Sequence, residues 1–322
     1  MTLKSAADTL VTVFGGSGFL GRHVVRALAN RNYRIRVAVR RPELSGHLQP
    51  LGRVGQIHAV QANLRFPRSV EAAARDADVV VNLVGILFER GRQRFNAVQA
   101  EGAQAVALAA NAAEARLVHV SAIGADENSP SRYARSKAAG ERLVLAAEPA
   151  ATIVRPSIIF GPEDDFLNRF AALACLSPAL PLVDGGHTRL QPVFAGDVAE
   201  ALARAVDGTV KPAVYEFGGP DVRTFREVLE LILAIIERRR LLVPVPASLM
   251  KLQAWFLQFL PKPPITPDQV ELLKSDNIVS DAAKREGRTL EAIGIVPASI
   301  PVVAPDYLWR FRKAGQFSGR TA

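Results

Sequence analysis

The sequence predicts an α/β protein: a doubly wound parallel sheet with a smaller C-terminal domain interleaved with it. Strand-like and helix-like segments alternate through the first half of the chain. The strand-like segments are short, β-branched and almost continuously apolar, and a glycine-rich turn follows the first of them. Such strands are typical of parallel sheets whose two faces are both covered by helices.

The alternation sets out the predicted elements in order. Strands are expected at 10–14, 34–40, 56–62, 78–85, 116–124 and 151–159, and helices at 23–30, 69–77, 95–113 and 133–147. After residue 165 the rhythm breaks, and a helix at 193–206 is expected to return to the sheet. We therefore predict a nucleotide-binding domain over 1–160, completed by about 190–220, and a smaller substrate-like or docking domain over 161–322.

Composition narrows the classes of function. The chain has 322 residues, 49% of them apolar, and a net charge of +9 that favours phosphates, anionic lipid or an acidic protein partner. No nucleic-acid-binding module is recognisable, so no nucleic acid partner is expected. The single cysteine and the absence of metal-ligand spacing predict no disulfide, no metal and a reducing compartment. No run is long enough for a membrane span, and a bacterial cytoplasmic protein is expected.

The stretch FGGSGFLGRH at 14–23 carries the most specific motif. Gly15, Gly18 and Gly21 follow a predicted strand and open a predicted helix, with Phe19 and Leu20 between them. In this setting the first glycine permits a tight turn, the second admits a pyrophosphate to the helix N-terminus, and the third lets helix and strand pack closely. The sequence predicts a dinucleotide-binding domain of the Rossmann type.

The end of the second predicted strand bears on the choice of cofactor. Arg40 and Arg41 stand where an NAD-binding protein usually has an acid for the ribose hydroxyls. A guanidinium there can pair with a 2′-phosphate, which predicts NADP(H). The alternative is that both arginines are simply solvated before a proline turn.

Tyr133 and Lys137 form the third signal. Positions four apart share a helix face, so the ammonium can lower the pKa of the phenol and hold the nicotinamide ribose. The pair is a candidate catalytic couple, with Tyr133 as proton donor and Lys137 as its positioner. The alternative is that Lys137 binds ribose with no chemistry following.

These motifs resemble those of the extended short-chain dehydrogenases/reductases. The likeness runs through the glycine turn, QANL, NLVG, HVSAIG, YARSK and RPSIIFGPED, and covers most of residues 10–220. It implies that Asn63 and Leu64 flank the adenine, that Val84 and Gly85 line the adenine-ribose side, and that Pro156 to Ile158 approach the nicotinamide. Ser121 joins the expected cofactor-binding residues.

The segments 188–202 and 215–232 are similar to an atypical branch of that family, which contains the NADPH-binding accessory subunit of respiratory complex I. This resemblance implies a structural nucleotide, complex I subunits as partners, and a peripheral position on the cytoplasmic face of the bacterial inner membrane. Ala122 and Ile123 follow Ser121 where sugar-nucleotide enzymes carry a substrate-binding hydroxyl. The alternative is a free-standing NADPH-dependent enzyme that uses Tyr133 and Lys137 on a small quinone- or isoprenoid-related substrate.

Two further stretches lie outside these motifs. In the segment 249–259 the residues Leu249, Leu252, Trp255, Phe256 and Phe259 share one helical face. That face either packs on its own domain or docks on a partner or an anionic membrane surface, together with the basic tail at 309–320. The acidic run at 163–165 is expected to be a solvated loop.

Overall fold

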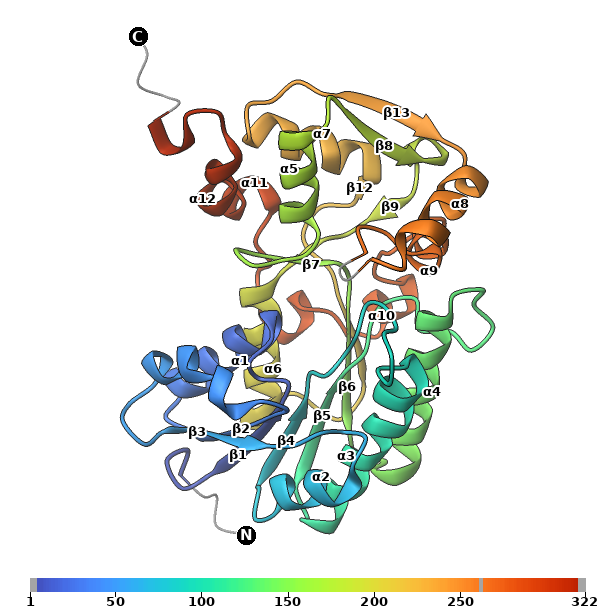
Figure 1. Cartoon of the computed structure of the whole chain (residues 1–322). Coiled ribbons are helices and arrows are strands. Elements are labelled where there is room, and N and C mark those ends of the chain that lie inside the picture. The colour runs from blue at the N-terminus through green and yellow to red at the C-terminus, as the bar shows by residue number, and fades with distance from the viewer. Residues whose placement is uncertain (1–4, 261–262, 318–322) are drawn as a thin grey trace.

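The computed structural model describes residues 5–260 and 263–317. Its centre is a seven-stranded parallel sheet with the strand order β11-β6-β5-β4-β1-β2-β3 (Figure 1). The strands are β1 (Leu10–Phe14), β2 (Arg34–Val39), β3 (Ile57–Gln61), β4 (Val79–Asn82), β5 (Arg116–Val120), β6 (Thr152–Pro156) and β11 (Val214–Phe217). The predicted doubly wound parallel sheet is confirmed.

The order of the strands indicates which edge of the sheet is suited to a ligand. The chain winds outward from β1 through β2 to β3, then crosses back so that β4 pairs with the other side of β1. Val11 of β1 therefore lies opposite Ile35 of β2 and Val79 of β4. Ligands of open α/β sheets bind outside the carboxyl ends of the strands at such a reversal, and the glycine turn follows β1 there.

Helices cover both faces of the sheet (Figure 1). Val24, Val25 and Leu28 of α1 share one buried core with Val198 and Leu202 of α6. The opposite face carries a second core to which α2, α3 and α4 contribute. The bounds are α1 (Phe19–Asn30), α2 (Pro67–Ala74), α3 (Glu101–Ala112), α4 (Arg132–Ala147) and α6 (Ala195–Asp207).

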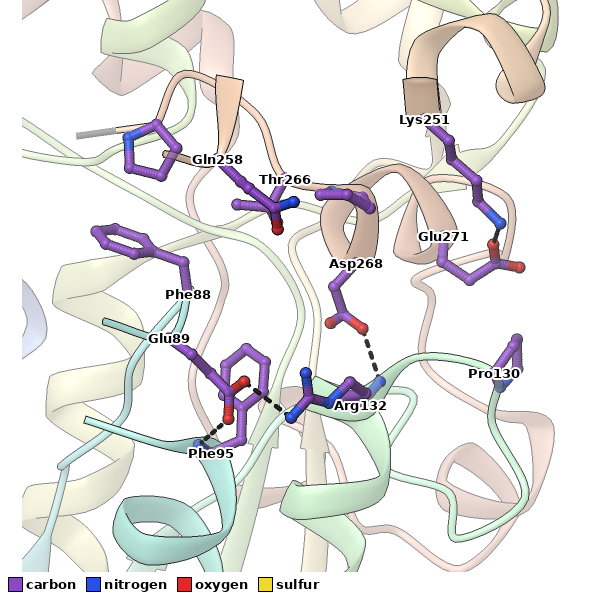
Figure 2. Close-up of a pocket in the computed structure, with 12 residues that line it drawn as sticks. Phe88, Glu89, Phe95, Pro130, Arg132, Lys251, Gln258, Thr266, Asp268 and Glu271 are labelled. Atoms are coloured by element: carbon purple, nitrogen blue, oxygen red, sulfur yellow. Dashed lines mark hydrogen bonds and ion pairs between the residues drawn. The ribbon is translucent and has the colours of Figure 1, made fainter. Parts of the chain in front are cut away.

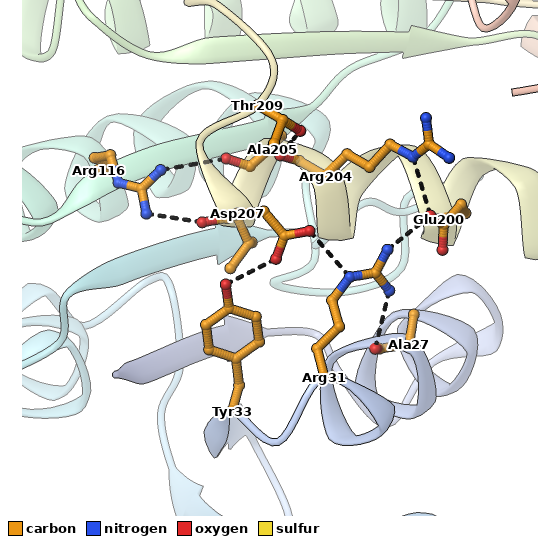
Figure 3. A network of polar contacts seen from close by, with 10 residues as sticks. Ala27, Arg31, Tyr33, Arg116, Glu200, Arg204, Ala205, Asp207 and Thr209 are labelled. Carbon is orange, nitrogen blue, oxygen red and sulfur yellow. Dashed lines mark hydrogen bonds and ion pairs between the residues drawn. The ribbon is translucent and has the colours of Figure 1, made fainter. Parts of the chain in front are cut away.

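A polar network fixes the returning helix α6 to the start of the chain (Figure 3). The guanidinium of Arg31, at the end of α1, donates to Asp207 at 3.0 Å and to Glu200 at 2.6 Å. The Tyr33 hydroxyl donates to the other oxygen of Asp207 at 2.7 Å. Because Glu200 and Asp207 both belong to α6, about 170 residues of chain are closed into one unit at this point.

The remaining elements build a second layer above the carboxyl edge of the sheet (Figure 1). Their core joins α5 and α7 to the buried residues Ile300, Tyr307 and Leu308 near the C-terminus. Leu290 and Ile295 pack instead into the α1/α6 core, so the chain crosses between the two layers again. The strands here are β7 (Ile159–Phe160), β8 (Ala179–Val183), β9 (Arg189–Leu190), β10 (Val193–Phe194), β12 (Arg223–Thr224) and β13 (Leu241–Val245); the helices are α5 (Leu167–Leu176), α7 (Phe225–Ile235), α8 (Ala247–Leu257), α9 (Pro267–Leu272), α10 (Asp281–Arg285), α11 (Ile300–Val303) and α12 (Pro305–Leu308).

The structure shows whether the apolar face predicted at 249–259, most of it on helix α8, packs on its own domain. Helix α8 buries only Met250 and Ala254, which pack with Val183 and Val270. The predicted apolar face is solvent-exposed by 51% to 73% at each of its positions, Leu249, Leu252, Trp255, Phe256 and Phe259. The interpretation that this face packs on its own domain is therefore wrong. None of the helices in the described part of the chain is long and apolar enough to cross a membrane.

Candidate functional site

The predicted cofactor-binding residues lie at the carboxyl ends of six neighbouring strands or in the loops and helix starts that follow them, along one edge of the sheet. The glycine turn follows β1, and the other predicted segments follow β2 to β6 in order. In sequence these are Gly15, Gly18, Phe19, Leu20 and Gly21; Arg40 and Arg41; Asn63 and Leu64; Val84 and Gly85; Ser121; and Pro156 to Ile158. Tyr133 and Lys137 stand in the first two turns of α4, beyond β5.

The glycine turn has the geometry that a pyrophosphate requires. Gly15 has φ +81°, in the left-handed region that favours glycine. A Cβ on Gly21 would lie 2.4 Å from the carbonyl oxygen of Gly15, so only glycine fits the crossing of α1 over the turn. The N-terminus of α1 has no side-chain cap and no acid in its first turn, so its free N–H groups are available to an anion.

The loops after β2 and β3 carry the residues that the sequence assigns to the adenosine half of a dinucleotide. Arg40 and Arg41 are exposed, and neither forms an ion pair with any residue of the described ranges. Asn63 is half-buried, and its Oδ1 accepts a hydrogen bond from the N–H of Arg65 at 3.2 Å. Its amide Nδ2 is left as a donor for an acceptor on a bound base.

Burial controls the chemistry of Tyr133 and Lys137. Burial raises the pKa of Tyr133 to about 12, and the charge of Asp268 acts in the same direction. Burial lowers the pKa of Lys137 to about 8, with Glu141 opposing the shift. The Lys137 Nζ donates to the carbonyl of Val120 at 3.2 Å and lies 5.9 Å from the centroid of the Tyr133 ring. The two side chains converge, but burial and the Asp268 charge raise the pKa of the phenol, where the sequence predicted that Lys137 would lower it.

The buried amide of Gln99 is hydrogen-bonded to α4, the helix that carries Tyr133 and Lys137. The Gln99 Nε2 donates to Ser136 Oγ at 2.7 Å, and Ser136 Oγ donates to the carbonyl of Tyr133 at 2.7 Å. The Oε1 of the same Gln99 accepts from the N–H of Ile86, in the loop after β4, at 3.1 Å. A Cβ on Gly140 would lie 2.1 Å from the Gln99 carbonyl, so α4 approaches this segment as closely as only glycine allows.

Asp268 is a site residue that the sequence did not reveal. Its carboxylate, on α9, accepts from the N–H of Arg132 at 2.7 Å, the N–H of Tyr133 at 3.1 Å and the Ser131 hydroxyl at 2.9 Å. A carboxylate at a helix N-terminus satisfies free N–H groups and complements the helix dipole. The helix that carries Tyr133 and Lys137 is thus capped by a residue from the second layer.

Asn277 makes the corresponding link to the loops after β5 and β6. Its Oδ1 accepts from the Ser157 hydroxyl at 2.6 Å and from the N–H of Ile158 at 3.1 Å. Its Nδ2 donates to the carbonyl of Ile123 at 3.2 Å. The signal in the sequence is only an asparagine in a loop, because its partners lie more than 115 residues away.

One buried polar atom at this edge of the sheet has no partner among the residues that the structure describes. Ser121 is buried, and its hydroxyl has no hydrogen-bond partner within the described residues. Because an unpaired buried hydroxyl is costly, a bound group with a donor or acceptor is expected beside it. The Ser121 hydroxyl, the free N–H groups at the start of α1 and the glycine turn together fit a dinucleotide. In the described part of the chain no group of His, Cys, Asp or Glu has the arrangement of a metal site.

The acidic run after β7 departs from expectation at one position. Asp164 is not solvated: it is buried, and burial raises the pKa of its carboxyl. It accepts hydrogen bonds from the N–H groups of Gly161 and Phe166 and from the Tyr307 hydroxyl at 3.0 Å. Its role is structural, because it ties the loop after β7 to α12.

Comparison with known proteins agrees with this geometry. The profile of the NAD dependent epimerase/dehydratase family matches residues 11–218. NADH dehydrogenase (ubiquinone) 1 alpha subcomplex subunit 9, mitochondrial, of Arabidopsis thaliana is 35% identical over 99% of this chain and 82% of its own length. The ceramide reductase of Caulobacter vibrioides is 43% identical over 200 residues, which are 62% of each chain.

A solved structure supports the fold alone. The NADPH-dependent quinone oxidoreductase of Escherichia coli, complexed with NADPH, superposes on this chain with a TM-score of 0.73. Its sequence is 17% identical, and the match covers 93% of this chain and 99% of its own. The glycine turn and, apart from Leu10, the parallel sheet lie within residues 11–218, which the family profile matches. This chain belongs to the NAD dependent epimerase/dehydratase family, in the atypical branch that includes the mitochondrial complex I subunits and ceramide reductase.

Proposed function

We propose that the protein is an NADPH-binding accessory subunit or assembly and stability factor of respiratory complex I, peripheral on the cytoplasmic face of a bacterial inner membrane. The observation that carries the proposal is the extent of the similarity to the plant subunit. It spans 99% of this chain, whereas the family profile ends at residue 218. The similarity therefore includes α8 to α12, and with them the exposed apolar face of α8.

The cofactor in this proposal is NADPH. Arg40 and Arg41 directly follow β2 and carry two unpaired charges in the described structure, and a 2′-phosphate would complement them. The glycine turn would hold the pyrophosphate, and Lys137 would donate to a ribose hydroxyl in place of its contact with Val120. A bound nucleotide supplies free energy to the native state by mass action, which suits a structural role.

The environment of Tyr133 supports that structural role. Within the described residues its hydroxyl makes no hydrogen bond, and its pKa is raised rather than lowered. Ala122 and Ile123 provide no hydroxyl next to Ser121. A phenol without a polar partner is poorly placed to pass a proton to a substrate.

Co-purification tests the proposal directly. Native membranes are solubilised in mild detergent, the tagged protein is captured, and complex I subunits and bound nucleotide are measured in the eluate. The expected result is complex I in the eluate, with close to one NADPH for each copy of the protein. An eluate that retains NADPH but lacks complex I subunits would contradict the assignment as an accessory subunit.

A second function is favoured by the ceramide reductase of Caulobacter, which has a higher identity than the plant subunit over a shorter segment. Under this alternative the protein reduces a ketone of a ceramide-class lipid to a hydroxyl. NADPH, when bound, supplies the hydride. Tyr133 gives its hydroxyl proton to the oxygen of the former carbonyl, and Lys137 holds the ribose. Oxidation of NADPH in the presence of a short-chain keto-ceramide, lost in Tyr133→Phe, would support this function.

A further inference from the structure

A cavity of about 320 Å³ lies between the two layers, next to the Tyr133 helix (Figure 2). Its walls are the loop after β4, the start of α4, residues 251 and 258 on and just after α8, and residues of 263–271 at and around α9. Phe95 lines it and also meets the Tyr133 ring edge to face, with centroids 5.9 Å apart. Asp268, another lining residue, accepts from the Tyr133 N–H. The cavity is therefore adjacent to the candidate catalytic pair.

The charges in the walls disfavour an anionic ligand. The two lining cations each pair with a lining carboxylate: Arg132 with Glu89 at 2.9 Å, and Lys251 with Glu271. Asp268 adds a third carboxylate, which is occupied by N–H groups of α4. Among the described lining residues no cation is left for a phosphate, and the formal charge of the wall is negative. Nucleoside diphosphate sugars and phospholipid headgroups are poor matches for this wall. The three carboxylates are occupied as well, Glu89 and Glu271 by the two cations and Asp268 by N–H groups of α4, so among these lining residues no carboxylate is free for a cationic ligand.

The chemistry that remains is uncharged and polar. Gln258 uses its Nε2 to donate to the carbonyl of Trp255 at 2.9 Å, which leaves its Oε1 as an acceptor. Phe88, Phe95 and the lining prolines supply apolar surface. The volume lies at the low end of ligand pockets, which span roughly 300–1,000 Å³, so it holds a small group and not a whole lipid.

Helix α8 connects this cavity to an apolar surface. Lys251 and Gln258, seven positions apart, stand on its cavity side. Leu252, Trp255 and Phe256 of the same helix are each more than half exposed. Trp255 and Phe256 also contact one another edge to face, with centroids 4.9 Å apart. A molecule with a polar end in the cavity would thus have an apolar surface at hand for hydrocarbon chains.

We propose that this cavity binds the uncharged amide- and hydroxyl-bearing end of a membrane lipid, whose chains lie against the exposed face of α8. The inference rests on the proposed peripheral membrane position, and it gives the lipid of the alternative reductase function a binding site next to Tyr133. The occupant is a single neutral lipid drawn from the bilayer. The exposed rings of α8 reach the bilayer interface, where aromatic side chains and apolar faces of amphipathic helices reside.

The test uses the full chain with NADPH bound and vesicles of phosphatidylcholine and phosphatidylglycerol. The vesicles contain a short-chain ceramide with an NBD fluorophore, and the protein is separated from them before its bound NBD is measured. Gln258→Trp fills the cavity from a helix end and is expected to lower capture at least tenfold without changing vesicle binding. Phe256→Asp should lower both capture and vesicle binding. Val54→Asp, at a fully exposed position in the loop before β3, should remain within twofold of the wild type.

Competition identifies the headgroup. Unlabelled short-chain ceramide should displace the probe, whereas NBD-phosphatidylglycerol should be captured at least tenfold less and dTDP-glucose should not compete. Equal capture of the anionic lipid, displacement by dTDP-glucose, or unchanged capture in Gln258→Trp would overturn the inference. Complex I co-purification and NADPH content are measured on the same variants. If both persist while capture fails in the wild type, the lipid site is refuted and the accessory-subunit function stands.

Discussion

Replacing Asp268 with alanine would remove three hydrogen bonds that hold the second layer to the start of the helix that carries Tyr133 and Lys137. The carboxylate accepts from two N–H groups in the first turn of α4 and from the Ser131 hydroxyl. Ser131 still caps the helix in the variant, because its Oγ accepts from the N–H of Ala134 at 3.2 Å. We therefore expect α4 to fold but to open more readily at its start.

The size of the effect follows from the groups that lose a partner. Loss of a capping side chain costs about 0.5–2 kcal/mol, and loss of a negative charge at a helix N-terminus costs roughly 0.3–1 kcal/mol more. A central value of about 2 kcal/mol corresponds to roughly 30-fold faster hydrogen exchange if the N-terminal turn opens locally. The Tyr133 pKa should also fall, because the Asp268 charge contributes to raising it.

Hydrogen exchange followed by mass spectrometry measures this directly on peptides that cover 131–140. The matched control is Asp281→Ala, which removes an exposed acid from the first turn of α10 and should leave those peptides unchanged. Asp268→Asn keeps one acceptor and should fall between the wild type and the alanine variant. If Asp268→Ala leaves exchange at the start of α4 at the wild-type rate, α9 does not hold this helix.

Three further predictions concern the cofactor edge and its support. Gly21→Ala places a Cβ 2.4 Å from the Gly15 carbonyl oxygen, so the affinity for NADPH, measured by fluorescence, should fall at least 100-fold. Excess NADPH should then fail to raise the melting temperature of this variant. Arg40→Ala and Arg41→Ala should each lower the preference for NADPH over NADH roughly tenfold by calorimetry, with NADH affinity as the control; an unchanged preference would exclude a 2′-phosphate contact. Burial lowers the pKa of His119 from 6.5 to about 3, so the stability it confers is complete above pH 6.5 and is lost as the pH falls toward 3. About 2 kcal/mol of unfolding free energy should disappear between pH 6.5 and 5 in urea titrations, and His119→Gln should flatten that slope.

The sheet and its ligand edge were predictable because their signals are local. Each strand is a short apolar run, and the residues predicted to contact the cofactor come directly after such a run, as Gly15 and Ser121 do. The parallel topology then brings those loops to one edge without further information. Asp268 and Asn277 lie beyond this logic, because each acts on loops more than 115 residues away.

Burial of single polar side chains was the least predictable property. Asp164 stands between two acids in a proline- and glycine-flanked turn, a pattern typical of solvated loops. Its burial depends on Tyr307, which is 143 positions further along the chain. The exposed face of α8 is the converse case, since an amphipathic pattern does not specify whether its apolar side meets the protein interior or an external surface.

The retention of Tyr133 and Lys137 does not by itself distinguish a reductase from a structural subunit. The Lys137 Nζ is buried beside the carboxyl end of β5, so it can serve a ribose hydroxyl in either function. Tyr133 differs, because only proton donation requires its hydroxyl. Lys137→Met should therefore weaken NADPH binding in both cases, whereas Tyr133→Phe should leave NADPH affinity and complex I co-purification within twofold of the wild type under the accessory function. If Tyr133→Phe instead abolishes ceramide-dependent NADPH oxidation while binding is preserved, the phenol is a proton donor and the protein is an enzyme.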